Sequence, residues 1–97
     1  MQTYAEFLTS VNIRDIRMLM LAAHKQSQQT NDPTEIALCK EDLDRLLDRG
    51  LVTEIRHRRE VQAGVLYDVF DCEVVQEAVE YLDRMCRERI AIDRTPR

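Results

Sequence analysis

Four consecutive side chains that carry or can carry positive charge lie near the middle of the chain, at Arg56, His57, Arg58 and Arg59. The chain has fourteen basic residues, and all except Lys25 and Lys40 are arginine. A guanidinium group presents a planar fork of donors that fits phosphate or carboxylate oxygens. The cluster therefore predicts contacts with such anions. The simpler interpretation is a solvated hairpin whose charges prevent pairing with the edge of another sheet.

The sequence offers little support for catalytic or metal-binding chemistry. Cys39, Cys72 and Cys86 do not have the spacing of zinc ligands, and His24 and His57 stand apart from them. No glycine-rich phosphate loop or nucleophile motif is present. We expect reduced thiols, no catalytic residue, no metal and no cofactor. Cys72, expected at the start of a helix, could gain some thiolate character there.

Length and composition predict a single domain over residues 1–97 with a small core. No stretch approaches the roughly 18 apolar residues of a membrane span, and the first ten residues lack the features of a signal peptide. We therefore expect a cytoplasmic protein without a membrane partner. The net charge of −4 is unevenly distributed: acids dominate residues 32–48 and 68–83, and arginines dominate residues 84–97.

Capping signals predict two helices at the start of the chain. Thr3 and Glu6 form a capping-box pattern for a helix over 4–10, and Asn12 can cap a helix over 13–25. The second helix is apolar on more than one side, so we expect it at the centre of the core. The polar segment 24–31 is expected to be a loop.

A third helix is predicted over 33–49, between the start signal Asp32-Pro33 and the stop at Gly50. An alternative is a break near residues 38–40, because Leu38 points away from the apolar stripe. The stripe that should face the core consists of Ile36, Cys39, Leu43, Leu46 and Leu47, and the outward face and its flanks consist of Glu41, Asp44, Arg45, Asp48 and Arg49.

A hairpin over 51–70 with a cationic tip should follow, because Val65 to Phe70 is rich in β-branched and aromatic residues. Asp71 is then expected to cap a last helix over 72–91, followed by a tail over 92–97. The apolar side of this helix covers about half its circumference, which is more than one core requires. We therefore expect a homodimer through this helix, with an interface of Val75, Ala78, Val79, Leu82, Met85, Cys86 and Arg89.

The order of a helix ending at Gly50, then Leu51-Val52, a cationic segment and a strand containing Tyr67 resembles the recognition helix and wing of the winged helix-turn-helix superfamily. The resemblance implies an α+β fold, mostly helical, with a two-stranded wing and a long C-terminal dimerisation helix. Winged-helix domains usually have two helices joined by a tight turn where this chain shows one pattern over 33–49. The implied DNA-binding residues are Arg45 and Arg49 in the major groove, and Arg56, His57, Arg58 and Arg59 on phosphates.

By this resemblance the chain would be a sequence-specific transcriptional regulator that binds double-stranded DNA as a homodimer, of the kind encoded by phages, mobile elements or bacterial operons. The acids beside Arg45 and Arg49 oppose this reading, because they would repel phosphates. The alternative is a winged-helix protein-interaction module, such as a phage inhibitor or assembly factor. Such a module would use acidic surfaces to dock on a basic partner.

Overall fold

The computed structural model describes residues 3–94 of the chain, with side chains through residue 88. This part is a small α+β fold, mostly helical, with four helices and one three-stranded antiparallel sheet. None of its helices is long and apolar enough to cross a lipid bilayer. In chain order the elements are α1 (Tyr4–Ser10), α2 (Ile13–Ala23), β1 (Gln28–Thr30), α3 (Pro33–Asp48), β2 (Val52–Gln62), β3 (Val65–Val74) and α4 (Gln76–Arg94).

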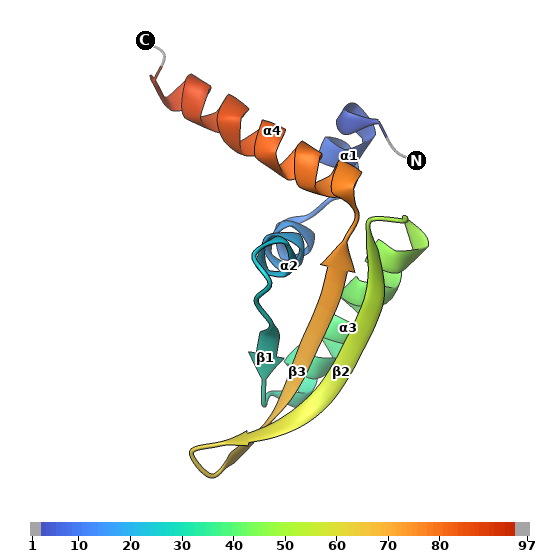
Figure 1. Ribbon diagram of the computed structural model, residues 1–97, viewed down its shortest axis with the longest axis vertical. Coiled ribbons are helices and arrows are strands. Elements are labelled where there is room, and N and C mark those ends of the chain that lie inside the picture. The colour runs from blue at the N-terminus through green and yellow to red at the C-terminus, as the bar shows by residue number, and fades with distance from the viewer. Residues whose placement is uncertain (1–2, 95–97) are drawn as a thin grey trace.

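The sheet has the strand order β1-β3-β2, so the last strand of the hairpin occupies the centre (Figure 1). Helix α3 lies along one face of the sheet, while α1, α2 and α4 gather at one end of it (Figure 1). The β2–β3 hairpin extends from this body in the opposite direction, and the molecule measures 50 × 31 × 22 Å.

The tip of the hairpin is the two-residue turn Ala63-Gly64. Both residues have positive φ, 50° and 80°, which is the conformation that matches the twist of a tight hairpin. The exposed side chains around this turn include Val61, Val65 and Leu66. The expectation of a cationic tip is therefore wrong, because the strands continue past the basic cluster and end in an apolar tip.

The predicted loop over 24–31 is wrong at Gln28–Thr30, which form β1. These residues pair with Asp68–Phe70 of β3, and the Gln62 side-chain amide donates to Gln29 across the central strand at 2.9 Å. A short polar segment carries no alternation that marks a strand. It becomes one because the neighbouring edge of β3 offers unpaired backbone groups.

The hairpin is longer than the predicted 51–70, and Asp71 is not a helix cap. Residues Asp71 to Val74 extend β3 because the start of β2 lies opposite them, with Val52 paired to Val74. Helix α4 consequently begins at Gln76 rather than at residue 72, and it continues to Arg94. Residues 95–97 of the predicted tail lie outside the described residues.

The first three helices begin at the predicted caps. The Thr3 hydroxyl accepts from Glu6 N, and Asn12 and Asp15 form a reciprocal capping box at α2. Asp32 accepts from the backbone of α3, with Pro33 in its first turn. Helix α3 is continuous to Asp48, close to the predicted 33–49, and it has no break near residues 38–40. A single helix therefore lies between β1 and β2.

The core forms where α1, α2, α3, α4 and the ends of the two long strands meet. Phe7, Leu19, Leu43, Leu46 and Phe70 are among its largest buried side chains. Two expectations about this core are wrong. Helix α2 is not buried on all its apolar sides, since Ile13 is 84% exposed, and Leu47 of α3 is 46% exposed rather than packed inside.

Candidate functional site

The predicted phosphate-binding cluster lies within β2 and alternates between the two faces of the sheet. His57 stacks on Phe70 with ring centroids 4.4 Å apart, and both rings line a small hollow beside Leu43 of α3. Because neighbouring strand residues point to opposite faces, Arg56 and Arg58 lie on the face that α3 leaves open. The cluster is therefore divided between two surfaces and does not form one basic patch.

On the open face, the arginines of β2 are matched by carboxylates. Arg56 Nη2 donates to Glu73 Oε1 at 3.2 Å. Arg58 Nε donates to Glu60 Oε1 at 2.7 Å, and Arg58 Nη1 also bonds to the Asp71 carboxylate. Two of these acids come from β3, where Glu73 and Asp71 lie diagonally across from the arginines that they bond.

The other two side chains of the cluster, His57 and Arg59, both contact Asp68. His57 Nε2 lies 2.7 Å from Asp68 Oδ1, and Arg59 Nε lies 3.4 Å from the same oxygen. The hydrogen bond from His57, with a smaller contribution from Arg59, holds the pKa of Asp68 below its ordinary value. All four side chains of the cluster therefore have carboxylate partners inside the hairpin, and the first acids of the run 68–83 are paired.

The two arginines expected on the outward face of α3 turn inward instead. Arg45 Nη2 donates to Asp42 Oδ1 at 2.9 Å and also bonds to the Asp15 carboxylate. Arg49 Nη1 donates to the carbonyl oxygen of Ser10 at 2.7 Å. The predicted outward position is wrong because Asp15, which caps α2, is completely buried and needs a cationic partner.

Arg14 of α2 belongs to the same cluster and was not identified from the sequence. Its Nε donates to Asp42 Oδ2 at 2.8 Å, and its Nη2 lies 2.8 Å from Glu35 Oε1. The hydrogen bonds to Glu35 and then to Asp42 raise the pKa of Arg14. The sequence shows only that Arg14 lies on one predicted helix and that Glu35 and Asp42 lie on the next. Their spacing along the chain does not indicate that they meet.

With its arginines turned inward, α3 presents three exposed carboxylates to solvent, and the exposed Lys40 lies beside one of them, Asp44. Glu41, Asp44 and Asp48 follow one another at spacings of three and four residues, which places them on one side of the helix. Leu38 and Leu47 flank them and are both partly exposed. Among the described side chains, none of the three carboxylates has an ion-pair partner. We call this surface of five residues the acidic α3 face.

The predicted dimer interface on α4 is largely occupied within the monomer. Ala78 is 0% exposed and Leu82 is 4% exposed, and both belong to the core. The expectation that Ala78 and Leu82 are free to contact a second chain is therefore wrong. Of the other predicted positions, Val75 and Met85 pack against the core. Val79 and Cys86 line a hollow beside α2. The side chain of Arg89 lies outside the described part.

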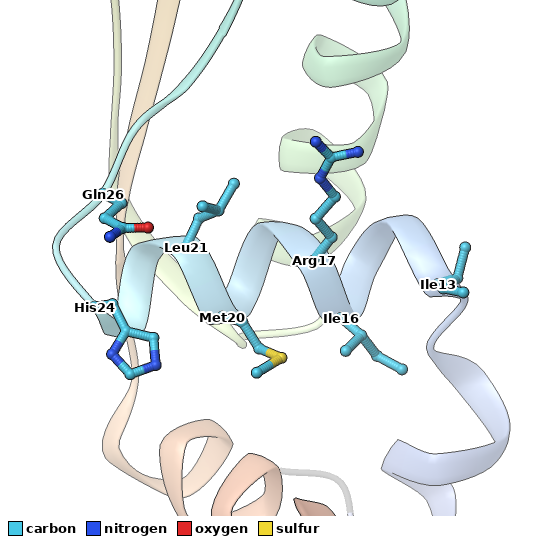
Figure 2. Close-up of a pocket in the computed structure, with 7 residues that line it drawn as sticks. All are labelled: Ile13, Ile16, Arg17, Met20, Leu21, His24 and Gln26. Carbon is cyan, nitrogen blue, oxygen red and sulfur yellow. The ribbon is translucent and has the colours of Figure 1, made fainter.

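The solvent side of α2 is hollowed into an apolar groove of about 360 Å³. Figure 2 shows Ile16 and Met20 pointing toward α4, whereas Arg17 and Leu21 point to the opposite side of the helix. A second hollow continues from Met20 and His24 onto α4. We call the two together the α2 groove; its lining residues are Ile13, Ile16, Arg17, Met20, Leu21, Ala23, His24, Gln26, Val79, Leu82, Asp83 and Cys86.

Two of the three cysteines, Cys39 and Cys72, are buried, and Cys86 is partly exposed. Burial raises the pKa of the Cys39 thiol, and it raises the pKa of Cys72 to about 11. The predicted thiolate character of Cys72 is wrong because this residue lies in β3 and not at a helix start. Within residues 3–94, no three side chains of the metal-binding types are grouped closely enough to hold an ion.

Comparison of the chain with protein-family models, with curated proteins and with solved structures finds no match.

Proposed function

We propose that this chain is a protein-interaction module that docks on a basic partner through the acidic α3 face. The observation that carries the proposal is the orientation of α3: its carboxylates Glu41, Asp44 and Asp48 face solvent, while Arg45 bonds to acids inside the molecule. A surface with this charge attracts a cationic partner and repels nucleic acid.

The flanking leucines give the acidic α3 face the composition of a docking site. Leu38 and Leu47 supply exposed apolar area on either side of the carboxylates. Burial of such apolar area on binding favours association, and the charges beside it set orientation and association rate. The partner that fits is an amphipathic helix or strand with lysine or arginine beside its apolar residues.

A sequence-specific DNA-binding regulator acting as a homodimer is the second candidate. Helix α3, the projecting hairpin and the long helix α4 follow one another in the chain, which favours this candidate, since these are the elements that the winged-helix resemblance implies (Figure 1). Contacts with phosphate would require Arg56, Arg58 and Arg59 to leave Glu73, Asp71 and Asp68. Those carboxylates would then lie beside the phosphates, which is the reason this candidate ranks second.

The test is binding of a fluorescein-labelled amphipathic peptide of leucine and lysine, measured by anisotropy at several salt concentrations. The decisive variant combines Glu41→Gln, Asp44→Asn and Asp48→Asn. We expect its Kd to rise about tenfold, since three exposed charges at about 0.5 kcal/mol each amount to about one decade. Its matched control combines Glu6→Gln, Glu77→Gln and Glu80→Gln, which removes the same charge from other exposed positions and should leave Kd nearly unchanged.

Equal losses in the two triple variants would overturn the proposal, because binding would then follow net charge rather than the acidic α3 face. A labelled random DNA duplex forms the second arm of the experiment. Tight, salt-dependent binding of that duplex by the wild type, weakened in a variant with Arg56, Arg58 and Arg59 replaced by alanine, would establish the DNA-binding candidate instead.

A further inference from the structure

Helix α2 exposes apolar residues that the monomer leaves uncovered. Ile13 is 84% exposed, Met20 is partly exposed, and Arg17 lies on the helix between them. Ile13 and Met20 are seven residues apart, which is the repeat with which two helices pack side by side. We call these three residues the α2 stripe. The same three residues line the α2 groove, so the exposed apolar side chains and the hollow belong to one surface.

The surface also contains one basic and one acidic side chain, Arg17 and Asp83. Among the described side chains, neither Arg17 nor Asp83 of α4 forms an ion pair, although most other arginines in this part of the chain do. Arg17 points away from α4, whereas Asp83 lies on α4 itself (Figure 2). The two side chains are therefore on opposite sides of α2 and do not meet within one copy.

We propose that the α2 stripe and α2 groove form a self-association surface, occupied by α2 of a second copy of this chain. A twofold axis running along α2 would set the helices side by side in parallel. Ile13 and Met20 would then contact their own counterparts. The same rotation would carry α4 of the partner to the side of α2 that holds Arg17. Each Arg17 would thereby face Asp83 of the other chain, and the contact would occur twice.

This charge arrangement is the reason for assigning the surface to a second copy. An unrelated partner would need an apolar ridge, an acid and a base placed to match, whereas a second copy brings all three by symmetry. The surface shares Val79, Leu82 and Cys86 with the predicted dimer interface, but its exposed apolar residues lie on α2. That interface relied on Ala78 and Leu82, which are buried in the monomer, whereas the α2 stripe is exposed. It is separate from the acidic α3 face, so the two proposals can fail independently.

The test exchanges the two charges. In the Arg17→Asp variant, residue 17 and Asp83 of the partner would repel, and in the Asp83→Arg variant Arg17 and residue 83 would repel. Each variant alone should run as a monomer under conditions where the wild type runs near twice the chain mass of 11.4 kDa. An equimolar mixture should restore the dimer, because both cross-chain contacts in the mixed pair join opposite charges. Sedimentation equilibrium at high micromolar concentration measures all three samples.

Lys40→Asp and Glu77→Arg are the matched controls, since they make the same charge changes at exposed positions outside this surface. Both should dimerise as the wild type does. The single variants should raise the dimer dissociation constant at least about tenfold, and circular dichroism should show that they remain folded. A monomeric wild type, single variants that dimerise normally, or a mixture that stays monomeric would each overturn the proposal.

Discussion

The β2–β3 hairpin and helix α3 both contain arginines, but the arginine side chains point in different directions in the two elements. In the hairpin, Arg56 and Arg58 remain on the surface, and carboxylates from the adjacent strand lie beside them. In α3, Arg45 turns into the molecule and leaves Asp44 and Asp48 outside. A run of one charge in a sequence therefore does not determine the sign of the surface it forms. Strand register and helical phase determine it.

The two regions should also differ in how much their ion pairs stabilise the fold. Exposed pairs such as Arg56–Glu73 and Arg58–Glu60 of the hairpin contribute little, because water screens them and long side chains lose entropy. Asp15 is completely buried, so an unpaired charge there would be costly.

The first prediction removes a cation from the buried cluster. Arg45→Met keeps an unbranched side chain but leaves Asp15 with the backbone bond from Asn12 and, among the described side chains, one ion-pair partner, Arg49, whose Nη1 lies 3.7 Å away. We expect the free energy of unfolding to fall by about 3–5 kcal/mol, as is typical when one partner of a buried ion pair is lost. Urea denaturation followed by circular dichroism measures the change. A loss below about 1 kcal/mol would mean that the cluster is as weak as the hairpin pairs.

The second prediction compares two adjacent leucines of α3. Leu46 is fully buried, so Leu46→Ala should lower the free energy of unfolding by about 2–5 kcal/mol. Leu47→Ala should change it by no more than about 0.5 kcal/mol, because that side chain is exposed. The same denaturation experiment tests both variants. Similar losses at the two positions would show that the helical phase of α3 described above is incorrect.

The bounds of α3 could be predicted from the sequence, but the orientation of its side chains could be predicted only in part. Its start at Asp32-Pro33 and its continuity to Asp48 follow from local signals, which act over a few residues. The inward turn of Arg45 does not follow from them, since its partner Asp15 belongs to another helix. The predicted core stripe also included Leu47 wrongly. Only part of the apolar side of α3 packs against the core, and Leu47 lies outside that part.

The candidate sites were predictable to a similar extent. A hairpin with arginines on its first strand could be expected from composition, but its length depended on pairing between Val52 and Val74 at its far end. Strand β1 gave no local signal, since Gln28–Thr30 are polar. The self-association surface was placed on α4 because the sequence showed too much apolar area there. Only the structure shows that Leu82 is already used in the core.

The third prediction concerns the free energy of unfolding at acidic pH, where we expect the smallest change of the three. Hydrogen bonds lower the pKa of Asp68, mainly from His57, and the pKa of Glu73, mainly from Lys25. Because the folded-state values lie below the unfolded-state values of about 4, these carboxylates stabilise the fold above that pH. The contribution should disappear as the pH falls through the folded-state values. Urea midpoints measured between about pH 6 and pH 2 should show a shallow decline.

His57→Phe is the matched variant for the acid experiment, because it retains an aromatic ring over Phe70 and removes the bond to Asp68. It should reduce the decline with acid, and the contribution that is lost should appear as a correspondingly lower stability near neutral pH. A steeper decline in this variant than in the wild type would contradict the assignment of the effect to the hairpin.

The position of β3 at the centre of the sheet has a consequence for the order in which the chain folds. Its pairing with β2 joins residues that are close in sequence around the Ala63-Gly64 turn, whereas its pairing with β1 joins Thr30 to Asp68 across α3. Closing the longer loop costs more chain entropy, and contacts between distant residues slow folding. The hairpin should therefore form early in the folding reaction. Strand β1 should dock late, and its amide protons should be among the first of the sheet to exchange with solvent.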